Sequence, residues 1–336
     1  MLLGRNISTD IKCLSTCVFA SLILFCAGCA QQDKNIADLN PEDLTASAKL
    51  IIADGLSDPD PRIRVNAIEA AVQTHQEQLM SKIQLMLVDD FVPVRFAAAV
   101  AVGDAEYYSA KPTLKRLLEN ADENTKLAAA YGLYKMGQKE NITILKDALN
   151  SEDPVSCANA ATLLGKAGDK SAIPLLYKVM ADTEADDKAV FQAAMARAML
   201  GDEEVVQRIW AMLISGYAED RVIGVQSMGA LGTRHAEEAL VTMLEDELIE
   251  VRLAAAGELG HLGNKIGEQT VKNLFEQHAW AQADDESAAR IEILASLAIG
   301  KIASESLKPY LADLIQSKSK NVKLAAAQAV LMFDEI

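Results

Sequence analysis

One phrase recurs along this 336-residue chain, and its recurrence limits the possible folds more than any other feature. Residues 250–263 read EVRLAAAGELGHLG, and near copies begin at Pro93, Asn124 and Asn321. Aligned on one position, the anchor, nine copies follow at spacings of 31, 31, 31, 33, 31, 31, 38 and 33 residues. The anchors are Arg64, Arg95, Lys126, Cys157, Val190, Arg221, Arg252, Arg290 and Lys323. A fixed period of about 20–50 residues indicates an array of stacked units.

Each copy has the pattern of a helix. The residue after the anchor is apolar, the third is small in every copy except at Ile293, and the seventh is apolar except at Arg197. Apolar spacings of three and four form one face of an α-helix, and a small-residue column lets helices approach closely. Eleven residues after the anchor, five consecutive copies have glycine, which predicts a left-handed helix end. These are Gly137, Gly168, Gly201, Gly232 and Gly263.

A second helix follows each phrase except the last, as in KPTLKRLLEN from Lys111 and AEEALVTMLED from Ala236. These phrases, together with SEDPVSCANAATLLGKAGDKSAIPLLYKVM from Ser151, resemble HEAT repeats of the short bacterial kind also called phycobilin-lyase-like. The resemblance covers roughly residues 58–336. It implies an all-α, right-handed α-α superhelical solenoid of about nine two-helix units, of armadillo type. Residues 41–336 would form it, with a capping helix at residues 41–57 covering the first repeat.

Composition limits the partners. Half of the residues are apolar, which excludes wholesale disorder. The formal charge of −16 repels a phosphate backbone, so nucleic acid is not an expected partner.

The N-terminus has the order of an export signal: Arg5 and Lys12, then the apolar residues 13–30, then polar residues. Ala27 and Gly28 before Cys29 resemble the lipobox of bacterial lipoproteins, which implies a signal peptide at residues 1–28, lipidation (palmitate) at Cys29 and a tether at residues 29–40. The lack of Asp after Cys29 resembles lipoproteins of the outer membrane, so we expect a lipid-anchored envelope protein on its periplasmic face. The alternative is an uncleaved anchor, because 18 apolar residues can span a bilayer.

The sequence offers no catalytic, metal or cofactor site. None of His75, His235, His261 and His278 has a ligand-spaced partner. Cys157 sits in an alanine-rich helix and is expected to be a buried apolar residue rather than a nucleophile. An enzymatic role therefore depends on the resemblance alone, since bilin lyases share these repeats.

Seven of the nine anchors are basic, so stacking should align them in a ladder along one side. They are Arg64, Arg95, Lys126, Arg221, Arg252, Arg290 and Lys323. The favoured reading is that each pairs with a loop carbonyl or carboxylate and fixes the stacking of the units; a ligand-binding row is the alternative.

The leading function is a membrane-tethered scaffold that binds a partner protein; the alternatives are a chaperone for an envelope complex or a lyase-like enzyme. In HEAT-like arrays the second helices typically line the concave side, so Lys115, Lys146, Tyr177 and Trp210 form the predicted partner-binding column there. Sealing of the seams between units is the alternative role for the two rings. The last copy has no second helix, so Leu331, Met332 and Phe333 are a candidate self-association site, unless they fold back on the preceding unit.

Overall fold

The computed structural model describes residues 41–281 and 283–333, which belong to one compact unit, Ile36–Ile336. Within these ranges the regular structure is entirely helical, and the all-α HEAT-type solenoid is confirmed. The predicted signal peptide, Cys29 and the tether lie outside the described residues. Among the described helices, none combines the length and hydrophobicity needed to cross a bilayer.

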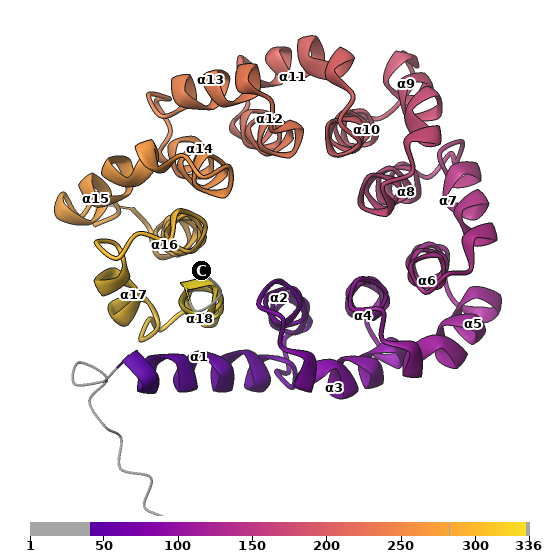
Figure 1. The fold of residues 1–336 in the computed structure, drawn as a ribbon, viewed down its shortest axis with the longest axis horizontal. Helices are drawn as coiled ribbons and strands as arrows, with labels where there is room; N and C mark the ends of the chain where they lie inside the picture. The colour runs from indigo at the N-terminus through magenta and orange to yellow at the C-terminus, as the bar shows by residue number, and fades with distance from the viewer. Residues whose placement is uncertain (1–40, 282, 334–336) are drawn as a thin grey trace, which may run out of the picture. The chain divides into compact units, whose positions relative to one another are not determined.

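The helices form two concentric layers (Figure 1). The inner layer holds the helices of the repeated phrase: α2 (Pro61–Gln73), α4 (Val92–Asp104), α6 (Glu123–Lys135), α8 (Pro154–Ala167), α10 (Asp187–Met199), α12 (Ala218–Leu231), α14 (Ile249–His261), α16 (Asp285–Ile302) and α18 (Lys320–Phe333). The outer layer holds α1 (Pro41–Gly55), α3 (Met80–Leu85), α5 (Lys111–Asn120), α7 (Ile142–Ala148), α9 (Ile173–Ala181), α11 (Val206–Leu213), α13 (Arg234–Met243), α15 (Glu268–Glu276) and α17 (Lys308–Leu314).

The beginnings of the inner helices follow from their local sequence, and their ends are those that the glycine column predicts. Asp60 and Asp153 accept hydrogen bonds from free amides of the first turn, and each precedes a proline in that turn. All five glycines of the predicted column have φ between 61° and 90°. His75 and Glu106 occupy the same column in the first two units and adopt φ of 47° without being glycine. The left-handed turn is therefore a property of the repeat and does not depend on glycine alone.

The prediction that the second helices line the concave side is wrong. They lie outside, on the convex surface, and the first helices face the centre (Figure 1). Small residues where neighbouring first helices meet explain this arrangement. A Cβ on Gly103 of α4 would lie 2.6 Å from Gly132 Cα of α6, and a Cβ on Gly165 of α8 would lie 2.9 Å from Ala196 Cα of α10. Helices separated by alanine approach more closely than helices separated by leucine, so the alanine-rich layer has the shorter circumference.

The array closes into a ring, because the last helix packs against the first two (Figure 1). Within the described residues no second helix follows α18, and α1 occupies the outer position beside it and completes the ninth unit. The expectation that Leu331, Met332 and Phe333 lack a sister helix is therefore wrong. Leu331 is buried, Met332 and Phe333 are half-buried, and the Lys308 ammonium lies 5.4 Å from the centre of the Phe333 ring. Likewise, α1 contacts α18 as well as the first repeat that it was expected to cover.

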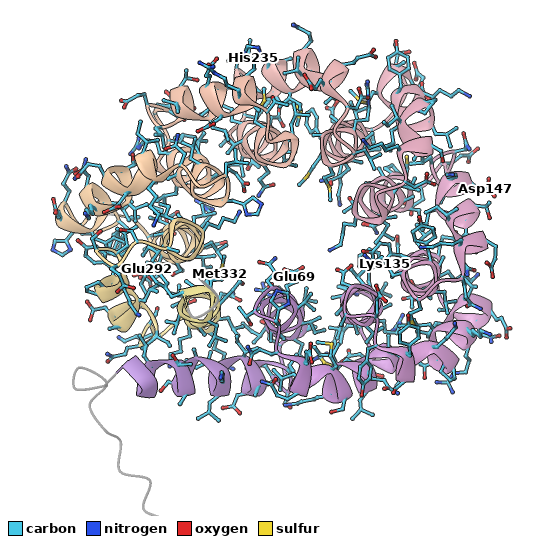
Figure 2. The ribbon with its side chains drawn as sticks, viewed as in Figure 1. Glu69, Lys135, Asp147, His235, Glu292 and Met332 are labelled. Atoms are coloured by element: carbon cyan, nitrogen blue, oxygen red, sulfur yellow. The ribbon has the colours of Figure 1, made fainter. Side chains whose placement is uncertain are left out.

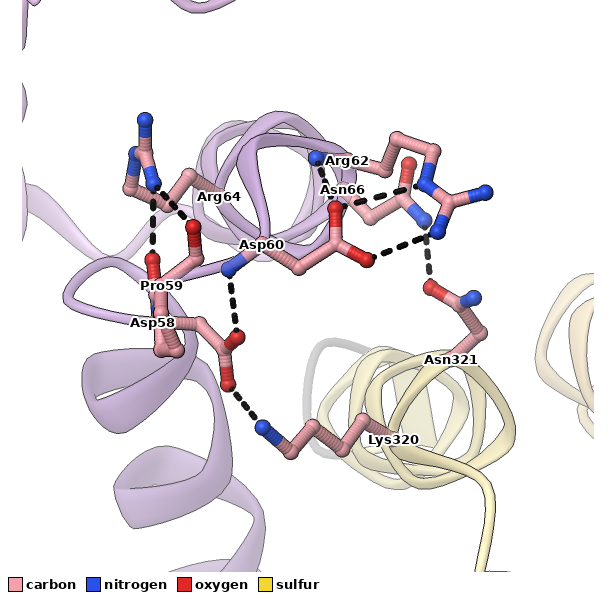
Figure 3. Close-up of polar contacts among 8 residues, drawn as sticks. All are labelled: Asp58, Pro59, Asp60, Arg62, Arg64, Asn66, Lys320 and Asn321. Carbon is pink, nitrogen blue, oxygen red and sulfur yellow. Dashed lines mark hydrogen bonds and ion pairs between the residues drawn. The ribbon is translucent and has the colours of Figure 1, made fainter.

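Polar pairs connect α2 to α18 at the closing seam (Figure 3). The Asn66 amide donates to Asn321 Oδ1 at 2.8 Å, and the Gln328 amide donates to Gln73 Oε1 at 2.6 Å. Both pairs join residues 255 apart, so the two helices run parallel and in register. An Asn159–Asn124 pair of 2.8 Å joins α8 to α6 in the same way, which shows that the closing seam resembles an internal one.

Candidate partner-binding surfaces

The predicted partner-binding column lies on the outer helices, with Lys115 on α5, Lys146 on α7, Tyr177 on α9 and Trp210 on α11. The residue before each is fully buried: Leu114, Leu145, Leu176 and Ile209. Lys115 is exposed, as are Tyr177 (58%) and Trp210 (39%), so both rings can be reached from solvent. This surface faces away from the centre of the ring.

Two members of the column are engaged by the following unit. The Lys146 ammonium lies 2.7 Å from both Asp169 Oδ2 and Ser171 Oγ, across the seam between α7 and the loop before α9. Tyr177 lies over the Arg197 guanidinium, 5.4 Å from the ring centre, and Arg197 is buried and paired with Asp202 at 2.7 Å. Arg197 is the one charged residue in the otherwise apolar column, and its guanidinium is satisfied there by the Asp202 carboxylate and the Tyr177 ring. Lys146 thus helps to seal a seam, whereas Tyr177 keeps more than half of its surface free.

Trp210 lines a groove of about 370 Å³ between α11 and α13, opposite His235 and Glu238. Figure 2 shows His235 on the outer side of the ring. Two further apolar side chains continue the surface beyond the end of α11: Ile214, 79% exposed, and Tyr217, 74% exposed. Helical periodicity could not predict either residue, because both follow α11: Ile214 is its C-cap, and Tyr217 precedes α12 with extended backbone.

The anchor arginines lie at the loops that join consecutive units. Arg64 donates to the carbonyls of Asp58 (2.8 Å) and Pro59 (3.2 Å) and to the Asp89 carboxylate (2.8 Å) of the next unit. Arg95 repeats this pattern with the carbonyls of Asp89 and Asp90 and with Asp122. Burial alone would raise the pKa of Asp122, but the Arg95 and Thr125 hydrogen bonds outweigh it and lower that pKa.

The remaining basic anchors make only some, or none, of these contacts with loop carbonyls and an aspartate. Arg221 donates to the Ser215 carbonyl and pairs with Asp246, whereas Arg252 donates to the carbonyls of Asp246 and Glu247. Arg290 is 57% exposed in its side chain and reaches Glu250 only at 3.4 Å. Within the described residues, no ion pair or side-chain hydrogen bond involves Lys126 or Lys323. The contacts are those of loop-to-loop stacking.

Cys157 interrupts this ladder. It is buried, its Sγ lies 3.4 Å from the Leu149 carbonyl, and burial raises the pKa of its thiol, so the side chain stays neutral at pH 7. A cavity of about 610 Å³ lies beside it, at the loops before α8 and α10.

A second cavity of about 490 Å³ lies on the inner side of α2, α4 and α8. Its wall is mostly apolar and includes Val72, Phe96 and Val100. The polar groups at one end include Asp104, which pairs with Lys166 at 2.9 Å and accepts a hydrogen bond from the Tyr131 hydroxyl. Burial, with the nearby Asp104 charge, raises the pKa of that phenol. The volume falls within the range of about 300–1,000 Å³ that is typical of ligand sites.

Glu69 lines the same cavity and points toward the centre of the ring (Figure 2). Its side chain is exposed to solvent, but the surrounding protein partly desolvates the carboxylate. This desolvation raises the pKa of Glu69, and the nearby Lys166 charge opposes the shift. Sequence periodicity gave no sign of this cavity, because it depends on the curvature that brings α2 and α8 near each other. Within the described ranges, no three His, Cys, Asp or Glu residues lie where they could hold a metal ion.

Comparison with known proteins supports the class. A family model described as HEAT repeats matches residues 79–156. The matched residues extend from the start of the second helix of unit one into the first helix of unit four, and they carry HEAT repeats. The described residues as a whole have the fold of an all-α HEAT-type solenoid.

Particular relatives are more distant. Deoxyhypusine hydroxylase of Danio rerio is 29% identical over 116 residues, which are 34% of this chain and 36% of that protein. The match therefore spans about a third of the relative's length. Among solved structures, the CpcE–CpcF complex of phycocyanin lyase from Nostoc sp. PCC7120 has a TM-score of 0.44 at 21% identity, covering 73% of this chain and 97% of that one. Human deoxyhypusine hydroxylase in complex with glycerol has a TM-score of 0.38 at 19% identity, covering 78% of this chain and 98% of that one.

Proposed function

We propose that this protein is a protein-binding scaffold tethered to the bacterial envelope, and that its partner docks on the outer surface of α9 and α11. The observation that carries this proposal is the exposed apolar row of Tyr177, Trp210, Ile214 and Tyr217 on otherwise well-packed units. Tyrosine and tryptophan are the residue types that most often dominate interface energies. The groove beside Trp210 supplies a concave place for a partner side chain.

The test is the double substitution Tyr177→Ala and Trp210→Ala, followed by crosslinking in the native envelope and identification of the captured proteins. We expect partners to be lost while the melting temperature changes little. A matched control is Tyr108→Ala, since Tyr108 is 59% exposed and precedes α5, away from the row. Loss of stability with partners retained would assign the two rings to seam packing.

Tethering is the second part of the proposal and has its own test. We expect the mature chain to partition with membranes through a lipid on Cys29, and Cys29→Ala to block processing. Normal cleavage and sorting of that variant, or a natural N-terminus that retains residues 1–28, would contradict the lipid anchor and favour the uncleaved span.

A scaffold and an assembly chaperone differ in how long the partner stays. Capture that survives extensive washing supports the scaffold, whereas capture that depends on the folding state of the client supports the chaperone. Both would use the same outer row, so the double substitution does not distinguish them.

A ligand-binding or lyase-like role is the other candidate, and the inner cavity favours it. An apolar wall with Glu69, Asp104 and Lys166 at its margin is the kind of site that binds an organic molecule. Incubation with a free bilin, followed by absorbance, tests the lyase resemblance. Binding or turnover that is lost in Val100→Trp, which fills the cavity, would support this role over a purely structural ring.

A further inference from the structure

The ladder of anchor arginines has one position where the acceptors are present and the guanidinium is missing. In units one and six, the arginine and the carboxylate that it pairs with are 25 residues apart: Arg64 with Asp89, and Arg221 with Asp246. The residue 25 positions after Cys157 is Asp182. The carboxylate of this rung is therefore kept although its cation is absent.

The loop around Asp182 has the conformation found at the occupied positions. Asp89 Oδ1 accepts the Phe91 amide at 3.0 Å, and Asp246 Oδ1 accepts the Leu248 amide at 2.8 Å. Asp182 Oδ1 accepts the Glu184 amide at 3.0 Å in the same two-residue turn. Asp182 thus shares the two-residue turn of the carboxylates that bind a guanidinium, and it is more exposed than Asp89 and Asp246.

Two other rungs show that this retention is not automatic. Where the anchor is Lys126 or Val190, the position 25 residues on is serine: Ser151 and Ser215. Neither rung has an arginine, and neither has an aspartate at this position, although Asp153, 27 residues after Lys126, matches Asp122, which Arg95 binds at that spacing. Only the Cys157 rung combines a neutral anchor with an aspartate, which leaves Asp182 without the partner that its counterparts have among the described residues.

The space for the missing group is present as well. The cavity of about 610 Å³ beside Cys157 is lined by Asp182, by Ser151 and Glu152, and by Glu184 and Asp186. Ser151 and Glu152 are six and five residues before the anchor, the positions whose carbonyls accept from Arg64 and Arg95. Four acidic residues line the cavity against one base, Lys178, so its charge favours a cation. We call this cavity the open rung.

We propose that the open rung binds the guanidinium of an arginine side chain supplied by a partner protein. The planar guanidinium would donate to the loop carbonyls and to Asp182, as Arg64 does within its own unit. The inference rests on the proposed scaffold function and places part of the partner next to the outer row, because Tyr177 directly precedes Lys178 of the open rung.

The first test titrates the full chain with N-acetyl-arginine amide, N-acetyl-lysine amide and N-acetyl-leucine amide, using amide chemical shifts around Asp182 as the signal. We expect the arginine amide to bind roughly tenfold more tightly than the lysine amide, since only the fork can donate to a carboxylate and carbonyls together. Asp182→Asn should abolish this preference. The control is Asp147→Asn, an exposed carboxylate on the outer side of α7 (Figure 2), which should leave it unchanged.

The second test supplies the group within the chain. Cys157→Arg should occupy the open rung, raise the melting temperature by a few degrees and abolish binding of the arginine amide. If that variant fails to fold, Cys157→Ser with bound arginine amide still reports on the cavity, because the cavity stays open. Equal binding of the three amides, or unchanged arginine binding in Asp182→Asn, overturns the proposal.

Capture in the envelope separates this inference from the proposed function. Loss of partners in Asp182→Asn, as in the Tyr177 and Trp210 double variant, supports both. Partners retained in Asp182→Asn but lost in the double variant would overturn the open rung and leave the outer row in place. Partners retained in both variants would contradict the scaffold surface itself.

Discussion

Asn66 and Asn321 are 255 residues apart in sequence, yet their side-chain amides share a hydrogen bond of 2.8 Å (Figure 3). Nearby, the Lys320 ammonium lies 2.6 Å from Asp58 Oδ2. That hydrogen bond lowers the pKa of Asp58, helped by the Asp60 amide. Asp58 occupies the same loop position as Asp89, so Lys320 supplies across the closing seam the cation that Arg64 supplies one unit later. The loop-to-loop ladder thus continues through the junction.

Closure should be sensitive to one glycine. A Cβ on Gly55, the last residue of α1, would lie 2.8 Å from Ala67 Cβ of α2 and 3.1 Å from Leu324 Cδ2 of α18. We expect Gly55→Ala to cost about 1–3 kcal/mol of unfolding free energy, because overpacking here forces the three helices apart. Denaturant unfolding measures this. Gly216→Ala is the control, since nothing lies within 4 Å of its Cβ and its φ is not positive; equal effects of the two variants would argue against a tight junction.

The anchor arginines should differ in their effect on stability. Arg95→Ala removes the side-chain donor from two loop carbonyls and leaves Asp122 with the Thr125 hydrogen bonds alone, and we expect a loss of about 1–3 kcal/mol in thermal or denaturant unfolding. Arg290→Ala should cost less than about 0.5 kcal/mol, because that side chain is more than half exposed and its contacts are long. A large loss at Arg290 with none at Arg95 would contradict the ladder as a stacking device.

Glu268 should make stability depend on acid pH. The Lys272 ammonium at 2.6 Å, with the hydroxyls of Ser306 and Ser304, lowers the pKa of Glu268 from 4.5 to about 2. Its contribution is therefore complete above pH 4.5 and is lost as the pH falls toward 2. Glu268→Gln should destabilise the protein by up to about 1 kcal/mol at pH 7 and by much less near pH 2.5. A difference between variant and wild type that is constant across this range would refute the linkage.

Replacing Glu106 with glycine should increase the stability of the protein. It occupies the left-handed column with φ of 47°, where a Cβ is strained, and it is exposed. Glu106→Gly is expected to raise the unfolding free energy by about 1 kcal/mol, less the entropy that glycine gains in the unfolded chain. The reverse change, Gly137→Ala at φ of 90°, should destabilise by a similar amount. Tm values for both variants decide the matter, and a loss in the first would show that the Glu106 side chain stabilises the turn.

The repeated phrase predicted most of the fold because its columns encode local contacts. Caps at Asp60 and Asp153, the glycine turns and the buried alanines all depend on residues within one or two units. Closure depends on the angle between units, a small quantity that accumulates around the array and has no signature in any one copy. The inner cavity and the convex placement of Tyr177 and Trp210 depend on the same curvature.

The open rung could have been found from sequence. The spacing of 25 residues from Arg64 to Asp89 and from Arg221 to Asp246 also joins Cys157 to Asp182. The anchor column alone does not show that Cys157 is an exception, because the exception appears only when the loop aspartates are aligned as a second column. The partner-binding role of Lys115, Lys146, Tyr177 and Trp210 stays a prediction, although the contact of Lys146 with Asp169 shows that one lysine also serves the seam.

The closed ring changes how this protein can vary in length. An open solenoid can gain or lose an internal unit at modest cost, because each unit contacts only its neighbours. Here α1 completes the unit that α18 begins, so adding or deleting one helix pair would alter the angle required at every seam and separate Asn66 from Asn321. Copy number is therefore fixed by geometry, and homologous chains that keep this junction should keep nine units even where their loops differ.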